Sequence, residues 1–291
     1  MGFVVCVRCG LKKSGEKNDH FVCEDCMNFS KFVNSLWNEI DAIFKHGSPD
    51  PDVHEELYLL ADAGFLTHQN PQTAIFYGLS ALVIECALMQ KPEITEVELN
   101  RKVSTTRGWG DVFKLFEELK IVSIRTDQYQ RILEIQEKAR KIASYLTLGA
   151  PLDEQVKKRV SHIFTGYILL RVLKKMSNLN KSEDLLVLPY NQRPRTLWVA
   201  LMYLWQTAYD GHHEFSEDDM RRFLSSRGVP SRTLVRIFQA LEHVYGRTTT
   251  GLTKDVRFEN GERRFIFSDY VSRVMERLRT RERERGERER S

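Results

Sequence analysis

Four of the five cysteines form two pairs near the N-terminus, Cys6 with Cys9 and Cys23 with Cys26. Each CxxC pair can present two thiolates from one tight turn, and the 13 residues between the pairs leave room for the two turns to face each other. Zinc prefers four such soft ligands in a tetrahedron. The spacing therefore predicts a zinc ribbon over residues 1–30.

A ribbon with four cysteine ligands leaves no open coordination position for water, so we expect Zn2+ as a structural cofactor and no catalytic metal. Gly10 fits the turn because it has no Cβ and can pass close to the sulfurs. His20 is an alternative ligand, although its place three residues before Cys23 favours a position outside the first coordination sphere. The fifth cysteine, Cys86, lies on the apolar face of a predicted helix and is assigned to the core.

The rest of the chain has none of the short motifs that are typical of enzymes. It has no GxxxxGK[ST] phosphate loop, no GxGxxG after a strand, no HExxH and no GxSxG. The most apolar window, residues 75–89, is interrupted by Glu85 and is too short to cross a bilayer. Without a secretion signal the default location is the cytoplasm, and we expect no membrane partner and no enzyme.

The length of 291 residues and the 42% hydrophobic content indicate several packed units, mostly α with small β-hairpins. Helical spacing of apolar residues over 31–67, with a break at 47–51, predicts two helices that connect the ribbon to the body. The predicted units are the zinc ribbon 1–30, the helical connector 31–72, a first winged helix 73–150, a connecting helix and linker 151–195, a second winged helix 196–272 and a charged Arg/Glu tail 273–291.

The first winged helix is predicted from three helices followed by two strands. The helices cover about 73–89, a short stretch capped by Thr95, and about 105–121. Alternating apolar residues after them favour a hairpin that turns about Asp127 and Gln128.

The same order returns in the second unit. A helix over 196–210 precedes one capped by Ser216 and one capped by Ser231. A hairpin follows, and its Asn260-Gly261 pair suits a type I′ turn because both residues tolerate positive φ. We therefore expect a structural repeat joined by one long amphipathic helix over 156–176, which could act as a spacer or as a dimerisation helix.

Positive charge is concentrated in residues 151–195 and in the tail, within a net charge of only +4. The tail alternates Arg and Glu and is predicted to form a frayed, solvated helix; a nucleic-acid-binding arm is the alternative.

In a helix-turn-helix protein, the N-terminal residues of the second helix reach base edges while neighbouring cations hold phosphates. The candidate DNA contacts in the second unit are Arg232, Thr233 and Arg236 on the helix and Lys254, Arg257, Arg263 and Arg264 on the hairpin. Those in the first unit are Thr105, Thr106, Arg107 and Lys114. The second unit offers the more basic surface.

The CVRC…CEDC ribbon joined to winged-helix units resembles archaeal DNA-associated factors in which a zinc ribbon sits beside helix-turn-helix domains. Tandem winged helices also look like the crenarchaeal winged-helix initiator protein, itself similar to replication-licensing factors of eukaryotes. General transcription factor B has a similar ribbon but continues into all-helical repeats, against which the Asn-Gly hairpin argues.

Two functions follow from these expectations. The first is a nucleoid-associated factor in transcription or DNA-replication control that reads double-stranded DNA through a winged helix. The second is a scaffold that docks its ribbon and winged helices on transcription, replication or segregation machinery, with nucleic acid held by the partner. Acidic residues on both units, such as Asp111 and Glu242, favour the second reading.

Overall fold

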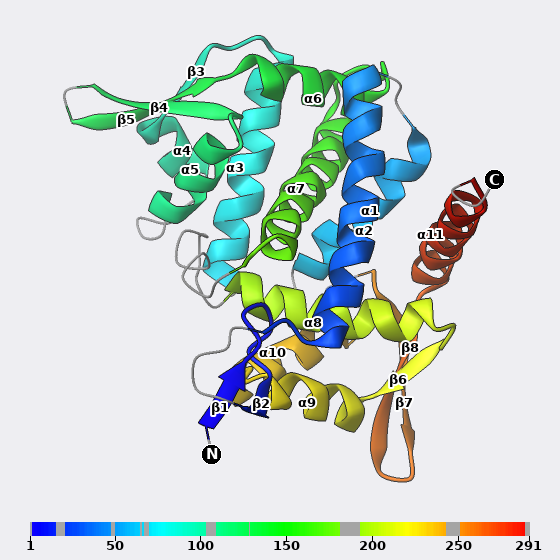
Figure 1. Cartoon of the computed structure of the whole chain (residues 1–291). Helices are drawn as coiled ribbons and strands as arrows, with labels where there is room; N and C mark the ends of the chain where they lie inside the picture. The colour runs from blue at the N-terminus through cyan, green and yellow to red at the C-terminus, as the bar shows by residue number, and fades with distance from the viewer. Residues whose placement is uncertain are drawn as a thin grey trace.

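The part of the chain that the structure describes is mainly helical, with three small antiparallel sheets (Figure 1). The computed structural model describes residues 2–15, 21–47, 50–64, 66, 70–102, 109–127, 129–180, 193–242 and 251–288. The helices are α1 (Glu24–His46), α2 (Pro51–Gly64), α3 (Asn70–Leu88), α4 (Glu96–Lys102), α5 (Trp109–Glu118), α6 (Glu137–Thr147), α7 (Glu154–Ser177), α8 (Arg193–Tyr209), α9 (Glu217–Ser226), α10 (Ser231–Leu241) and α11 (Asp269–Arg288). The strands are β1 (Gly2–Val5), β2 (Lys12–Gly15), β3 (Glu93–Thr95), β4 (Val122–Asp127), β5 (Gln130–Ile135), β6 (Glu214–Ser216), β7 (Thr253–Glu259) and β8 (Glu262–Phe267).

Two helices follow the ribbon, as the sequence predicts. The break between α1 and α2 falls at Gly47, whose positive φ of 72° allows its N–H to bond the carbonyl of Ile43 at 3.0 Å and close the helix. Pro51 then begins α2, in the first-turn position where a missing N–H costs nothing.

Helix α7 forms the centre of the body and is not a spacer or a free dimerisation helix. It packs against α1, α2, α3, α6 and α8, and buried residues recur on all sides of it from Val160 to Met176. At its tightest crossing, a Cβ added to Gly166 would lie 1.7 Å from the backbone oxygen of Leu57. Only glycine allows α2 and α7 to approach so closely.

The two predicted units do share an element order, helix, strand, helix, helix, strand, strand, and each is followed by a further helix. Their sheets also share a strand order, β3-β5-β4 in the first and β6-β8-β7 in the second, all antiparallel. The short strands β3 and β6 are absent from the sequence expectation because three residues carry too little periodicity to be recognised. The repeat therefore includes a third strand in each unit.

The hairpin turns differ in how well the sequence predicts them. Asn260 and Gly261 have φ of 53° and 81°, so the expected type I′ turn is confirmed. In the first hairpin, Asp127 pairs with Gln130, which places the turn one residue later than expected. Gln128, the second of the two residues expected in this turn, lies outside the described residues.

Two of the three predicted helix caps are confirmed. The Thr95 hydroxyl accepts from the N–H of Glu98 at 3.3 Å while the Glu98 carboxylate accepts from the N–H of Thr95, a reciprocal capping box. The Ser216 hydroxyl accepts from the N–H of Asp219 at 3.0 Å. The cap of α10 is wrong: Pro230 occupies that position and Ser231 is the first helical residue.

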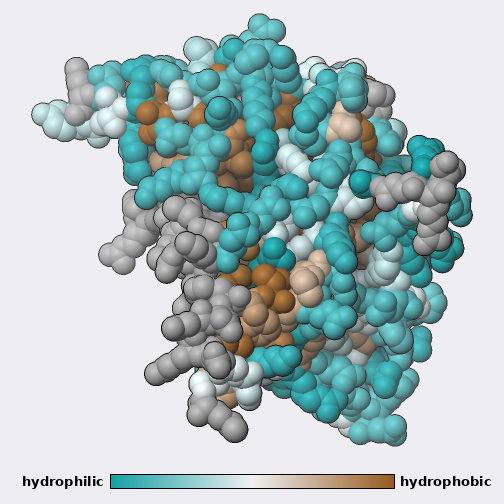
Figure 2. All heavy atoms as spheres, viewed as in Figure 1, coloured by the Kyte–Doolittle hydropathy of each residue, from teal (hydrophilic) through white to brown (hydrophobic). Residues whose placement is uncertain are grey.

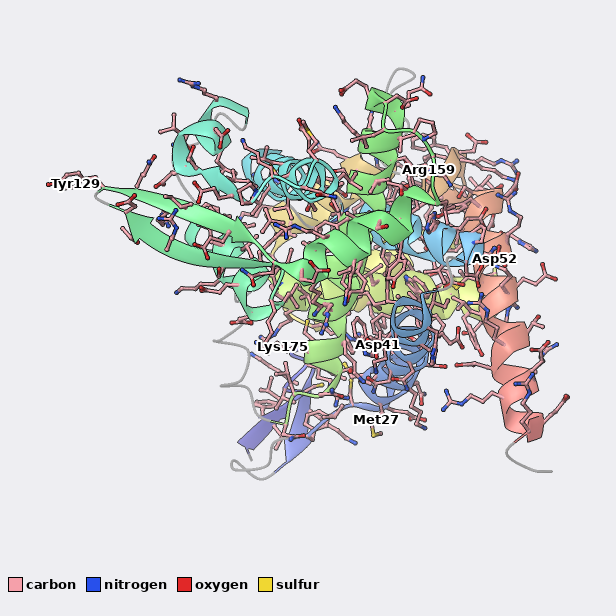
Figure 3. All side chains as sticks on the ribbon, turned by 90° about the horizontal axis from the view of Figure 1, so that it is seen from above. Met27, Asp41, Asp52, Tyr129, Arg159 and Lys175 are labelled. Carbon is pink, nitrogen blue, oxygen red and sulfur yellow. The ribbon has the colours of Figure 1, made fainter. Side chains whose placement is uncertain are left out.

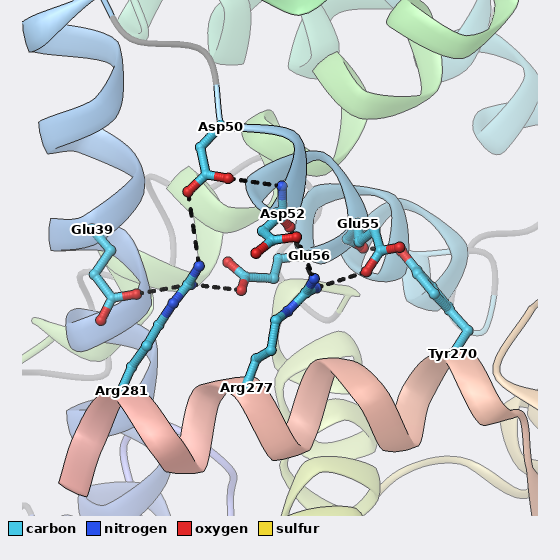
Figure 4. Close-up of polar contacts among 8 residues, drawn as sticks. All are labelled: Glu39, Asp50, Asp52, Glu55, Glu56, Tyr270, Arg277 and Arg281. Carbon is cyan, nitrogen blue, oxygen red and sulfur yellow. Dashed lines mark hydrogen bonds and ion pairs between the residues drawn. The ribbon is translucent and has the colours of Figure 1, made fainter. Parts of the chain in front are cut away.

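The charged tail is not a separate solvated segment, because α11 runs unbroken through residue 273, the predicted boundary. Figure 4 shows how its arginines reach α1 and α2. Arg281 pairs with Glu39 at 3.1 Å and with the fully buried Glu56 at 2.7 Å, and Arg277 pairs with Asp52 at 2.7 Å. The second unit is thereby fastened to the N-terminal helices.

The surface of the protein is mostly polar on the face that Figure 1 also shows. Figure 2 shows a face covered mostly by hydrophilic residues, with a smaller hydrophobic cluster below its middle. Within the described residues, none of the helices has the length and apolarity needed to span a membrane.

We expect the stability of the protein to fall between pH 5 and pH 8 through Glu56. Burial raises the pKa of this carboxyl to about 7, against the opposing effect of Arg281 and Arg277. The folded chain then binds the proton more tightly than the unfolded chain, so the stabilisation is complete at low pH and is lost as the pH rises through about 7. The loss amounts to at most about 3 kcal/mol.

Urea denaturation at several pH values checks this expectation. Glu56→Gln should reduce the pH dependence of stability in this range, whereas Glu55→Gln, a half-buried neighbour that pairs with Arg277, should keep it. An unchanged pH profile in Glu56→Gln would contradict the assignment.

Candidate metal centre and nucleic-acid interface

The first cysteine pair lies in a tight turn between β1 and β2. The N–H of Cys6 bonds the carbonyl of Leu11 at 2.8 Å, and the N–H of Gly10 bonds the carbonyl of Cys6 at 2.9 Å. Gly10 lies in this turn with a φ of 84°, which favours glycine, but the atoms nearest to a Cβ added there belong to Arg227 and Arg195 and not to the sulfurs. These bonds direct the side chains of Cys6 and Cys9 inward, where both are fully buried.

The second pair is positioned by the start of α1. Cys23 is the N-cap residue and Cys26 lies in the first turn, and the N–H of Met27 bonds the carbonyl of Cys23 at 3.0 Å. The four sulfurs of the two pairs lie within 4.8 Å of one another, and the Sγ atoms of Cys9 and Cys23 are 3.6 Å apart. A tetrahedral zinc with Zn–S bonds of about 2.3 Å separates its sulfurs by about 3.8 Å. The group is thus suited to a metal ion such as zinc.

The sulfurs cannot all ionise without a cation. Hydrogen bonds with Cys23 and Cys26 lower the pKa of the Cys6 thiol, while hydrogen bonds with Cys23 and Cys6 raise that of Cys26. The alternative ligand His20 lies outside the described residues.

The cysteine cluster is covered by α8, which the sequence reasoning did not foresee. The indole N–H of Trp198 donates to Sγ of Cys26 at 3.2 Å, and the Met202 sulfur lies 3.8 Å from the same atom. Phe29 packs edge-on against Trp198 with ring centroids 4.7 Å apart. Trp198 and Met202 are four residues apart and lie on one face of the helix. This spacing predicts a buried face but does not predict that the face packs on the cysteine cluster.

The helix with the best candidate DNA contacts exposes them. In α10, Leu234, Ile237, Phe238 and Leu241 are buried, which turns the opposite face to solvent. Arg232 and Arg236 are exposed there and Thr233 is half-buried. Among the described residues neither arginine has an acidic partner within ion-pair distance.

The hairpin candidates of the second unit are paired with carboxylates. Lys254 contacts Asp269 at 2.7 Å, Arg257 contacts Asp255 at 3.6 Å and Arg264 contacts Glu214 at 2.6 Å. Arg263 pairs with both Glu217 and Glu242. These four cations therefore add little free positive charge to the hairpin.

The first unit retains few of its candidates. Lys114 is exposed on α5, whereas Thr105, Thr106 and Arg107 lie outside the described residues. On the hairpin, Arg125 is paired with Glu93 at 2.7 Å. The structure thus brings the unpaired candidates together only on α10, within the part of the chain it describes.

Both hairpins carry an exposed aromatic side chain that sequence reasoning did not single out. Tyr129 is fully exposed at the tip of the β4–β5 hairpin and points away from the body (Figure 3). Phe258 is 74% exposed near the tip of the β7–β8 hairpin. Alternation of apolar and polar residues places side chains on the two faces of a strand but does not show which face is solvated.

Replacing one cluster cysteine should release the metal. We expect Cys9→Ser to lose bound zinc and to unfold at a lower temperature, because three thiolates hold the ion less tightly and the apo site leaves like charges buried together. Metal analysis of the purified protein measures the zinc, and a melting curve measures the stability.

Cys86→Ala serves as the control, since Cys86 is buried in α3 and is not part of the cluster. It should keep one zinc per chain. Full zinc retention in Cys9→Ser would exclude Cys9 as a ligand.

Comparison with protein-family models, with curated proteins and with solved structures finds no match to this chain. The features of this chain that bear on its function are the metal centre and the exposed face of α10.

Proposed function

We propose that this protein holds a structural zinc ion in its cysteine cluster and binds double-stranded DNA through α10. The metal has a structural role because all four ligands are buried cysteines, which fill the four tetrahedral positions and leave none open for water. The same proposal treats both repeated units as winged helices. Their shared element order and their sheets, in which the last strand lies between the other two, support this assignment.

The observation that carries the DNA proposal is the pair of unpaired arginines on α10. Arg232 and Arg236 are one turn apart on the exposed face, with Gln239 a further turn along. Arginine can contact phosphates or bind the N7 and O6 acceptors of guanine bidentately, and glutamine can bind adenine. Such a helix is the part of a helix-turn-helix unit that enters the major groove.

The distribution of unpaired cations predicts that the protein contacts only a few DNA phosphates. The hairpin cations are already paired with acids, so most of the salt-dependent affinity should come from α10 itself. This gives the proposal a quantitative test, because few phosphate contacts predict a shallow salt dependence. A regulatory role in transcription or replication is the functional context we propose for such binding.

The double variant Arg232→Ala/Arg236→Ala should weaken duplex binding by at least about tenfold. It should also reduce the slope of log affinity against log salt by about 2, because two fewer counterions are released. Fluorescence anisotropy with labelled random, promoter and origin duplexes across a salt series measures both quantities.

A control double variant on α1, Lys31→Ala/Lys45→Ala, also removes two exposed cations, of which Lys45 pairs with Asp41 at 2.6 Å, and should leave affinity and slope nearly unchanged. Equal affinities for the α10 variant and the wild type would reject α10 as the DNA contact.

A second candidate function is a protein assembly factor, and the exposed apolar side chains favour it. Val235 is 48% exposed on the same face of α10, and Phe258 and Tyr129 occupy the hairpins. Apolar side chains at such positions are typical of protein interfaces.

We expect a scaffold to retain a stable protein complex in a pull-down after nuclease treatment, and Phe258→Ser to weaken that complex. Duplex binding by the pure protein, lost in the α10 double variant, would instead support the first function.

A further inference from the structure

The metal centre touches the turn that leads into α10. Figure 1 shows the β1–β2 ribbon beside the second unit. A Cβ added to Gly10, in the cysteine turn, would lie 3.0 Å from the carbonyl oxygen of Arg227, which immediately follows α9. The cysteine turn therefore rests directly on the backbone between α9 and α10.

An ion pair joins the second cysteine pair, at the start of α1, to the same residue, Arg227. Arg227 donates to the carboxylate of Asp25, which lies between the ligands Cys23 and Cys26 in the first turn of α1. The Arg227 side chain is only 5% exposed, and its guanidinium lies 3.5 Å from the ring centroid of Phe223 in α9. Arg227 also donates to the carbonyl of Phe223 at 3.1 Å. A charge so enclosed holds its position firmly, because leaving it unpaired would be costly.

The turn itself is short and leaves α10 little freedom. Gly228 has a φ of 73° and its N–H bonds the carbonyl of Ser225 at 2.9 Å. Val229 is buried, and Pro230, with its fixed φ, is the N-cap residue of α10. The first turn of α10 thus begins four residues after Arg227.

From these contacts we infer that Asp25 and Arg227 are positioning residues through which the zinc-loaded cysteine cluster sets the placement of α10. The ribbon then acts as a brace, by which we mean that its contacts with Arg227 hold the DNA-reading helix α10 in a fixed position. This inference deepens the proposed function and rests on it only for the consequence that DNA affinity depends on the brace.

The variant Asp25→Asn tests the inference because it removes the charge while keeping the side chain's shape and the four ligands. Hydrogen exchange should accelerate by about tenfold at residues 228–234 and not at the hairpin tip 259–262. Zinc content should remain one per chain, and duplex affinity should fall by about tenfold. Arg227→Lys should act in the same direction, since lysine lacks the planar fork that pairs and stacks here.

Asp219→Asn is the matched control. It breaks an exposed pair with Arg222 in the same helix, α9, and should change neither exchange at 228–234 nor affinity.

The readouts separate this inference from the proposed function. Faster exchange at 228–234 with zinc retained supports the brace even if the wild type binds no duplex, in which case only the DNA function fails. Unchanged exchange in both Asp25→Asn and Arg227→Lys would overturn the inference, whatever the DNA affinity.

Discussion

Four cysteine sulfurs within 4.8 Å of one another in a buried site can be stable as thiolates only if a cation lies among them. That requirement joins three parts of the chain that are otherwise far apart. The turn between β1 and β2 supplies two cysteines, the start of α1 supplies the other two, and α8 covers them with Trp198 and Met202. The cluster is therefore a junction inside the protein rather than an independent appendage.

The rest of the body is organised around α7. Its close crossing with α2 at Gly166 brings the N-terminal helices against the centre, and α11 returns from the second unit to the same helices through Arg277 and Arg281. The second unit is thus held on one side by the cysteine cluster and on another by α11. The first unit depends on α3 and α6, which pack against α7.

Features set by neighbouring residues were predictable from the sequence. The CxxC spacing identified the cluster, the Asn260-Gly261 pair identified a turn, and Ser216 identified a helix start, because each signal acts within a few residues. The third strand of each sheet was missed, since β3 and β6 gain their hydrogen bonds from β5 and β8.

Contacts across long stretches of sequence could not be predicted in the same way. The Arg/Glu pattern of the tail is satisfied equally well by pairs within one helix and by partners such as Glu56, which lies 225 residues before Arg281. The candidate cations of the hairpin were likewise identified by residue type, although their availability depends on carboxylates from other elements. Arg263 is an example, because it forms an ion pair with Glu217 of α9.

The residues that cover the cysteine cluster are synthesised well after the cysteines themselves. Trp198 lies 172 residues after Cys26, and Arg227 lies 202 residues after Asp25. At ~5–20 residues per second, the ribosome adds α8 roughly 10 to 35 seconds after the last cysteine ligand. During that interval the nascent ribbon holds its thiols without their apolar cover, so early capture of the metal would protect them until the second unit arrives.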